Sequence, residues 1–441
     1  MKKLFALLLT LTMIAGCFGL AAAEEDHKPA GGSYEYTLRE DGTAVITKYT
    51  GEEENVVVPG ELDGHIVAGI GRSAFIANKS MTGLEIPGSV KTIGEQAFCQ
   101  CLGLKKATLQ PGVEEIGEDA FYFCTALEEI SLPEGLRAIG DDAFLNCKAL
   151  QYVSLPMSIA EIGVNPFRAC DDLAGIGLPE DHPVFAFEDG ALLNRNSHLL
   201  IVRLRTSEAA EYTVPDGITT IGAYCFSGNK ALVKVELPES VTAIGDNAFL
   251  WCSALEEISL PDGMEVIGDS TFQLCKSLKE VRLPAGLKII GSSAFDSCEQ
   301  LEKVTFPETV QEIGKFAFHN CIGLKELSLP SGLAVLDEHA FADCDSLEKV
   351  TIPGSVQNIG SGVFNLCKNL EEAVLEEGVE TIGNMVFAFC SSLKKVTIPA
   401  SVKAIGQDAF HAVKDAAFIV EPGSYAEQYC AENNLIFTSP Q

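Results

Sequence analysis

The chain has 441 residues, with 62 acidic residues against 31 Lys and Arg, and a formal net charge of −31. So acidic a surface repels phosphate backbones and anionic headgroups, which argues against nucleic-acid binding and direct membrane docking. This length ordinarily predicts two or three globular domains, but a fixed internal period overrides that expectation because a repeat array grows in one dimension.

Residues 1–23 are predicted to be an export signal. Two lysines precede an apolar run ending at Ile14, which is too short to span a membrane. Two cleavage sites compete: an A-x-A site at residues 21–23, and a lipoprotein-type site before Cys17, where Cys17 would carry the lipid. The residues after Cys17 stay apolar, which favours ordinary cleavage. Either route predicts an extracellular or cell-surface protein, and loss of the two lysines makes its formal charge −33.

Residues 31–80 are predicted to form an N-terminal cap. Two strand-like stretches, residues 34–38 and 44–47, flank the dipeptide Asp41-Gly42, which favours a hairpin. Residues 56–80 read as a degenerate first coil. A solenoid needs such a cap, since its first coil would otherwise expose core and an open sheet edge.

A 23-residue repeat fills residues 81–172 and returns over residues 209–415. Its consensus, numbered from the first Leu, is L-x-x-V-x-L-P-x-G-V-x-x-I-G-x-x-A-F-x-x-C-x-x. Apolar residues at positions 4 and 6 flank one polar position, the pattern of a short strand with one buried face. Pro at position 7 ends that strand. The copies therefore predict strands lying side by side.

Two further positions predict the remainder of each coil. Position 14 is Gly in nearly every copy, which predicts a turn with positive φ, and the exception Asp337 is a residue that tolerates that conformation. Ala-Phe at positions 17 and 18 precedes Cys at position 21, a spacing that places Phe and Cys on one face of a helical or 3₁₀ turn.

The Pro after the strand, the Ile-Gly turn and the A-F-x-x-C ending resemble the BspA-type leucine-rich repeat family of bacterial surface and secreted proteins. The resemblance covers residues 31–438. It implies a repeat solenoid with a parallel β-sheet on one face, short turns or helical turns on the other, and a cap at each end. It also implies contact with host cells, matrix proteins such as fibronectin, or neighbouring bacteria, and names no site residue.

The array breaks at residues 173–208. This island contains two apolar stretches and, in so acidic a chain, an unusual group of basic residues, including Arg195, Arg203 and Arg205. An island projecting from a solenoid is suited to partner contact. A family insertion whose hairpin shields the break explains the same residues more simply.

Eleven of the fifteen cysteines occupy position 21. One inward residue per coil fits a ladder of small buried thiols better than a disulfide framework, because an odd count of equivalent residues pairs poorly. A metal site is not expected, since no C-x-x-C occurs and the histidines are scattered.

The outward positions give candidate binding surfaces. Lys and Glu nearly alternate at position 3, which predicts a self-neutralising charge ladder. Position 5 is mostly Ser or Thr; hydroxyl rows suit a sugar or an extended peptide, but they also suit any exposed strand. Position 20 is usually polar but is bulky and apolar in five copies, and packing against a neighbouring loop competes with partner binding as the reason. These residues are Phe123, Trp251, Leu274, Leu366 and Phe389.

Residues 416–441 are predicted to form a C-terminal cap, where an S-x-x-E capping box at Ser424 opens a short helix and a last strand follows.

Nearly every polar residue belongs to a repeat column, so no convergent catalytic group or cofactor motif is present and an enzyme is not expected. The leading hypothesis is an extracellular module that binds a protein or glycan, with a cell-envelope spacer as the alternative.

Overall fold

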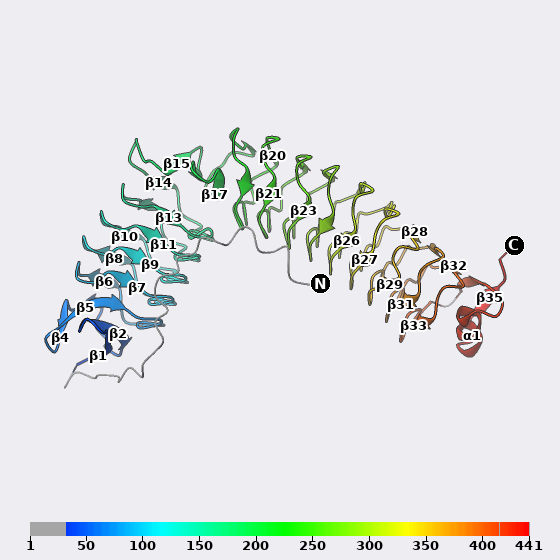
Figure 1. The fold of residues 1–441 in the computed structure, drawn as a ribbon, viewed down its shortest axis with the longest axis horizontal. Helices are drawn as coiled ribbons and strands as arrows, with labels where there is room; N and C mark the ends of the chain where they lie inside the picture. Colours follow the sequence, from blue (N-terminus) through cyan, green and yellow to red (C-terminus); the bar gives the residue numbers. More distant parts are fainter. Residues whose placement is uncertain (1–31, 414, 441) are drawn as a thin grey trace.

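A computed structural model describes residues 32–413 and 415–440, which form an arch of stacked coils (Figure 1). The predicted signal, with Cys17, lies outside the described residues. The predicted leucine-rich repeat solenoid is confirmed: strands of successive copies pair in parallel at a spacing of one repeat, as Lys106 of one coil does with Glu129 of the next.

Most coils contribute a longer strand near positions 3–6. These strands form the long-strand sheet, which is interrupted at the island and again after β24, where isolated bridges continue it. Its strands are β3 (Asn55–Val57), β6 (Gly83–Ile86), β8 (Lys106–Leu109), β10 (Glu129–Ser131), β12 (Tyr152–Ser154), β14 (Gly175–Gly177), β18 (Glu211–Thr213), β20 (Lys234–Glu236), β22 (Glu257–Ser259), β24 (Glu280–Arg282), β28 (Lys349–Ile352), β30 (Glu372–Leu375), β32 (Lys395–Ile398), β34 (Ala417–Val420) and β35 (Ile436–Thr438).

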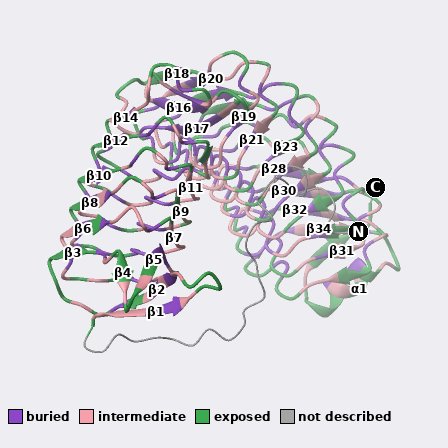
Figure 2. Cartoon of the chain, turned by 60° about the vertical axis from the view of Figure 1, so that its left-hand side comes forward, coloured by how far each residue is buried: buried purple, intermediate pink, exposed green. Residues whose placement is uncertain are grey.

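A second, shorter strand at positions 12 and 13 was not predicted from the sequence. It forms the short-strand sheet, and in both views of the N-terminal half the longer strands lie toward the outside of the arch and the shorter strands toward its inside (Figures 1 and 2). Its strands are β5 (His65–Ile70), β7 (Thr92–Ile93), β9 (Glu115–Ile116), β11 (Ala138–Ile139), β13 (Glu161–Ile162), β19 (Thr220–Ile221), β21 (Ala243–Ile244), β23 (Val266–Ile267), β25 (Ile289–Ile290), β26 (Glu312–Ile313), β27 (Val335–Leu336), β29 (Asn358–Ile359), β31 (Thr381–Ile382) and β33 (Ala404–Ile405).

Positions 14–22 form the third side of each coil, the turn face. It consists of overlapping tight turns closed by i→i−3 hydrogen bonds, which is the short-turn form of the two that were expected. In one coil, Ala97 N donates to Gly94 O (3.2 Å) and Cys99 N donates to Gln96 O (3.0 Å). The next coil accepts the remaining donors, as Phe98 N bonds Ala120 O at 2.8 Å. These bonds between coils satisfy main-chain groups that a helix would satisfy within itself.

The prediction that the position-14 glycines have positive φ is wrong. Gly94 and its equivalents are not left-handed, and neither is Asp337, so tolerance of that conformation does not explain the exception. The glycines permit close stacking: a Cβ on Gly94 would lie 2.8 Å from Ile70 O, and one on Gly140 would lie 2.6 Å from Glu118 N. The left-handed residues are at positions 16 and 20 instead, for example Gln96 and Gln100.

The core is built from the same columns in every coil, so buried residues recur along the whole arch (Figure 2). Position 18 forms a stack of phenylalanine rings, whose neighbouring centroids lie 4.8–5.8 Å apart from Phe226 to Phe410. No coil buries its apolar face alone, so stability comes from stacking between neighbours.

The fourteen cysteines that the structure describes are buried free thiols. Each of the eleven at position 21 donates a hydrogen bond to the main-chain oxygen of the position-18 residue one coil earlier, as Cys101 Sγ does to Phe75 O, with S···O distances of 3.1–3.3 Å. Burial raises the pKa of Cys170 and Cys252 to about 12, so these thiols remain protonated donors.

Both ends are closed by non-repeat elements. At the N-terminus, β1 (Tyr34–Leu38) and β2 (Ala44–Tyr49) pair antiparallel, β2 continues parallel onto β5, and β4 (Glu61–Leu62) pairs with β5. At the C-terminus, α1 (Tyr425–Glu432) begins after Ser424, whose side chain accepts from Glu427 N. The Glu427 carboxylate accepts from Gly423 N at 2.7 Å, one residue before the donor of the usual capping box.

The island forms three strands, β15 (Phe185–Glu188), β16 (Ala191–Asn194) and β17 (Leu199–Arg203), in an antiparallel sheet, and β17 then pairs parallel with β19. Neighbouring side chains on β16 enter different cores: Leu192 packs in the N-terminal cluster, whereas Ala191 and Leu193 pack in the C-terminal one. The island is therefore a wall between two hydrophobic cores and not a free projection.

Candidate interaction surface on the turn face

All five apolar residues at position 20 lie on the turn face in the left-handed conformation, with φ between 62° and 64°. Each main-chain N–H donates to the position-19 carbonyl of the next coil, as Trp251 N does to Gln273 O at 2.8 Å and Phe389 N to His411 O at 2.8 Å. These bonds fix the backbone of position 20 regardless of its side chain. The side chain is then directed away from the core, where inward positions 18 and 21 are already filled by Phe and Cys.

Two pairs of these residues lie on adjacent coils. In the first pair, Trp251 is 51 % exposed and Leu274 half-buried, and Lys230 Nζ lies 5.2 Å from the indole centroid. In the second pair, Leu366 is half-buried and Phe389 is 43 % exposed. Phe123 is 36 % exposed and has polar residues on both sides of it in the position-20 column, Gln100 and Asn146. The structure thus leaves two apolar patches at least partly open, as expected for a surface that contacts a partner.

Sequence reasoning missed one exposed apolar residue in a coil of the second patch. Met385, at position 16 of the coil that contains Phe389, is also left-handed (φ 53°) and exposed. The signal was present, because position 16 is polar in most copies. The apolar residue in this column was not taken as a candidate, because the sequence does not show that position 16 shares the left-handed, outward geometry of position 20.

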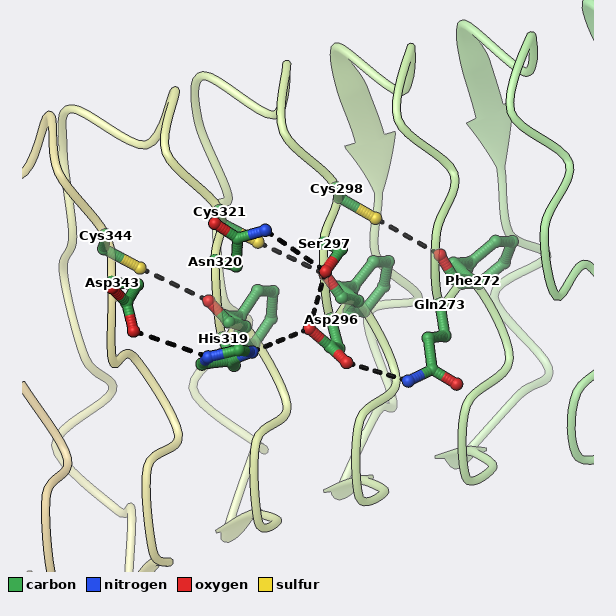
Figure 3. A network of polar contacts seen from close by, with 12 residues as sticks. Phe272, Gln273, Asp296, Ser297, Cys298, His319, Asn320, Cys321, Asp343 and Cys344 are labelled. Atoms are coloured by element: carbon green, nitrogen blue, oxygen red, sulfur yellow. Dashed lines mark hydrogen bonds and ion pairs between the residues drawn. The ribbon is translucent and has the colours of Figure 1, made fainter.

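A polar cluster separates the two patches. Over the intervening three coils, position 20 is Ser297, Asn320 and Asp343. His319 lies at the centre of this cluster, with Nδ1 2.9 Å from Asp296 Oδ1 and Nε2 3.5 Å from Asp343 Oδ2 (Figure 3). At roughly 4.8 Å per coil, the four coil steps from Leu274 to Leu366 place the two patches about 20 Å apart.

Neighbouring carboxylates set the protonation of this cluster. The hydrogen bond to Asp296, aided by the charges of Asp296 and Asp343, raises the pKa of His319 against a smaller opposing effect of burial. Asp296 also accepts from Gln273 Nε2 at 2.8 Å and from Ser297 Oγ at 2.9 Å, and its pKa is lowered because these hydrogen bonds and that from His319 together outweigh burial. The cluster joins four consecutive coils.

The structure separates the island arginines from this surface. Arg203 is only 3 % exposed: its guanidinium lies 4.6 Å from the Tyr212 ring centroid, and burial lowers its pKa. The expectation that Arg203 contributes to an open binding surface does not fit this burial. Arg205 bonds Ser227 O and Asp171 (both 2.8 Å), which joins the two sides of the break.

Arg195 is the island arginine that remains open to solvent, 3.4 Å from Glu188 Oε1.

The gap beside the wall encloses a cavity of about 10 Å³, room for no more than a single water molecule. Within residues 32–413 and 415–440, no group of three or more His, Cys, Asp or Glu side chains is placed to hold a metal ion, and no helix has the length and apolar character needed to cross a membrane.

The charge ladder on the long-strand sheet is confirmed. Lys395 Nζ lies 2.8 Å from Glu372 Oε1, Lys349 pairs with the same carboxylate at 3.4 Å, and Lys106 lies 2.9 Å from Glu129. Such exposed pairs are each worth about 0.2–1 kcal/mol. They neutralise this face instead of concentrating charge of one sign on it.

Comparison with known proteins identifies the fold family. A family model described as "BspA type Leucine rich repeat region (6 copies)" matches residues 68–192, 205–307 and 288–416. A leucine-rich repeat protein from Eubacterium ventriosum is 24 % identical, with a TM-score of 0.64, over 78 % of this chain and 95 % of that one. One from Bacteroides ovatus is 26 % identical, with a TM-score of 0.55, over 88 % and 98 %. A search of curated proteins finds no match. The chain belongs to the BspA-type leucine-rich repeat family.

Proposed function

We propose that the chain is an extracellular adhesion module that binds a protein partner through the turn face of its C-terminal half. The family and its solenoid fold support an interaction module, because an extended repeat array offers a long surface to a large partner and no deep cleft for catalysis. The predicted export signal supports a site of action at or beyond the cell surface.

The observation that carries this proposal is the identity of the position-20 residues. A left-handed backbone costs a non-glycine residue about 1–2 kcal/mol, and Asn or Asp relieves part of that cost, as Asn320 and Asp343 do in the same column. Trp251 and Phe389 have no such compensation and keep large apolar surfaces in water. Neither backbone preference nor burial accounts for them, whereas aromatic anchors are enriched where partners bind.

The proposed footprint is a strip with an apolar patch at each end and the His319 cluster between them. It is roughly 30 Å long, from the coil of Trp251 to that of Phe389, which suits a folded protein better than a small molecule.

The test measures binding of the chain without residues 1–23 to an array of host matrix proteins and bacterial surface proteins. Trp251→Ser and Phe389→Ser are compared with Phe123→Ser, a matched control with the same repeat position and backbone conformation but no apolar neighbour in its column. Saturable binding that the first two substitutions weaken and the control retains would support the proposal. Binding that neither substitution changes would contradict it.

The alternative is a cell-envelope spacer without a specific ligand. The neutralised charge ladder favours it, because a surface of paired exposed charges offers little to a charged partner. No saturable binding to any member of the array would leave the spacer as the better account.

A further inference from the structure

The long-strand sheet departs from its repeat next to the island. Position 3 of β12 is Tyr152, where most coils have Lys or Glu. The next strand, β14, has Gly175 and Gly177 at positions 3 and 5, and Gly177 replaces the Ser or Thr that is usual at position 5. Glycine inside a strand lowers stability, so two of them facing outward suggest that something approaches the backbone closely.

That approaching group is the Tyr152 ring. A Cβ added to Gly177 would lie 2.0 Å from the Tyr152 hydroxyl oxygen, and a Cβ added to Gly175 would lie 3.3 Å from ring atoms Cδ2 and Cε2. The ring therefore lies along the outer surface of β14, in space that any other side chain would occupy. Tyr152 is nevertheless 55 % exposed, so the side of the ring that faces away from the sheet is open to solvent.

Hydrogen-bonding groups lie on the side of Tyr152 away from β14. A shallow depression of about 620 Å³ lies over β8, β10 and β12, lined by Tyr152, Gln151 and the hydroxyl residues Ser131 and Ser154, among others. Its lining also includes the exposed ion pair of Lys106 and Glu129, which presents both a donor and an acceptor. The surface thus combines one flat apolar platform with a rim of amide, hydroxyl and charged groups.

We propose that this depression binds a neutral oligosaccharide, with one pyranose ring stacked on Tyr152. A pyranose has a small apolar face of C–H groups and a rim of hydroxyls that both donate and accept, which matches this arrangement. A proline-rich peptide would need an aromatic-lined groove for its successive rings, and here one aromatic residue is present. The strongly negative chain disfavours an anionic glycan.

The inference is independent of the protein-binding surface. Tyr152 lies on the long-strand sheet of the N-terminal half, whereas Trp251 and Phe389 lie on the turn face of the C-terminal half. A glycan can bind here whether or not the turn face has a protein partner, and each site has its own substitutions.

The test uses saturation-transfer NMR and titration of the chain without residues 1–23 with cellotetraose, chitotetraose and maltotetraose. We expect binding of at least one of them. Tyr152→Ser should weaken that binding by about tenfold, whereas Tyr152→Phe should retain it because the ring remains. Gly177→Ser should also weaken it, since its Cβ would displace the ring while leaving Tyr152 in the chain.

The matched control is Glu257→Ser, at position 3 of β22 on the same sheet, which should bind like the unchanged chain. The proposal is overturned if none of the three sugars binds, or if Tyr152→Ser binds as tightly as the unchanged chain. Thermal unfolding of each variant verifies that the fold is intact, which is expected because Tyr152 is exposed.

Discussion

The island and the position-20 column are both departures from the repeat, but they have opposite physical character. Three of the island's unusual residues are turned inward: Leu192 and Leu193 divide between two cores, and Arg203 is buried beside Tyr212. The unusual residues at position 20 are turned outward, onto a backbone that disfavours them. Packing of the two cores accounts for the buried island residues. It does not account for exposed apolar residues at position 20, which cost stability and therefore require another reason.

This difference also changes which experiment is informative. Deleting the island would expose an apolar face of each core, so lost binding in such a variant would report unfolding. Single substitutions on the turn face leave the cores intact.

Leu200→Ala, in the wall, should destabilise the protein by about 2–5 kcal/mol, because Leu200 is fully buried in the C-terminal core and its loss leaves a cavity. Hydrogen exchange should accelerate in β17 and β19, and the thermal midpoint should fall. Phe123→Ser serves as the exposed comparison and should change little. An unchanged midpoint for Leu200→Ala would show that the wall does not support the cores.

Arg203→Met should be neutral or stabilising by about 1 kcal/mol. Arg203 Nε and Nη1 are buried without a hydrogen-bond partner among the described residues, so an apolar side chain of similar length removes a desolvation cost. Chemical denaturation measures the difference. A substantial loss of stability would mean that the contact with Tyr212 outweighs the cost of burying the charge.

Trp251→Gly should stabilise the fold by about 1 kcal/mol while abolishing partner binding, because glycine adopts a φ near +64° without steric cost. Thermal unfolding and binding are measured on the same sample. Opposite effects on stability and binding would separate a binding residue from a packing residue. A loss of stability would assign Trp251 to packing against the neighbouring coil.

His319→Gln should change how stability depends on pH. The folded pKa of His319 is raised above its unfolded value near 6.5, so its contribution is fully present below that value and is lost as pH rises through the folded pKa. His339, on the next coil, opposes this effect because burial lowers its pKa. Unfolding midpoints at about pH 5.5 and about pH 8.5 should therefore differ between the variant and the unchanged chain mainly at the lower pH. An equal difference at both pH values would refute the role of protonation.

Lys395→Ala should change stability by less than about 0.5 kcal/mol, since the pair with Glu372 is exposed and that carboxylate retains Lys349. The small difference should shrink further in high salt. A larger effect would mean that the ladder contributes to stability beyond fixing the strand register.

The repeat columns predicted most of the fold because the residue type at a position reports its environment when the same environment recurs. Phe at position 18 and Cys at position 21 are inward, as expected, and the strand at positions 3–6 is present. The Gly at position 14 was misinterpreted because glycine serves two purposes, positive φ and close approach. Sequence alone does not distinguish them when the close neighbour is another coil's backbone.

The candidate surface was predicted only in part. Trp251 and Phe389 were identifiable because they break a polar column, whereas the island arginines were taken as exposed because charge usually is. Only the three-dimensional path of β17 reveals that Arg203 lies inside. Tyr152 was not identified from the sequence as a candidate binding residue, because the position of its ring depends on two glycines in the following coil.

The nearest-neighbour hydrogen bonds described for the cysteine column have a mechanical consequence. Each position-21 thiol bonds only the adjacent coil, and turn-face amides that bond between coils, such as Phe98 N, also reach only the adjacent coil, so an axial pull on the arch is resisted by short-range bonds between neighbours. Under tension the molecule should lengthen one coil at a time, and a released coil of 23 residues extends to roughly 75–80 Å. Within each regular stretch of repeats, single-molecule stretching should therefore show extension steps of similar length.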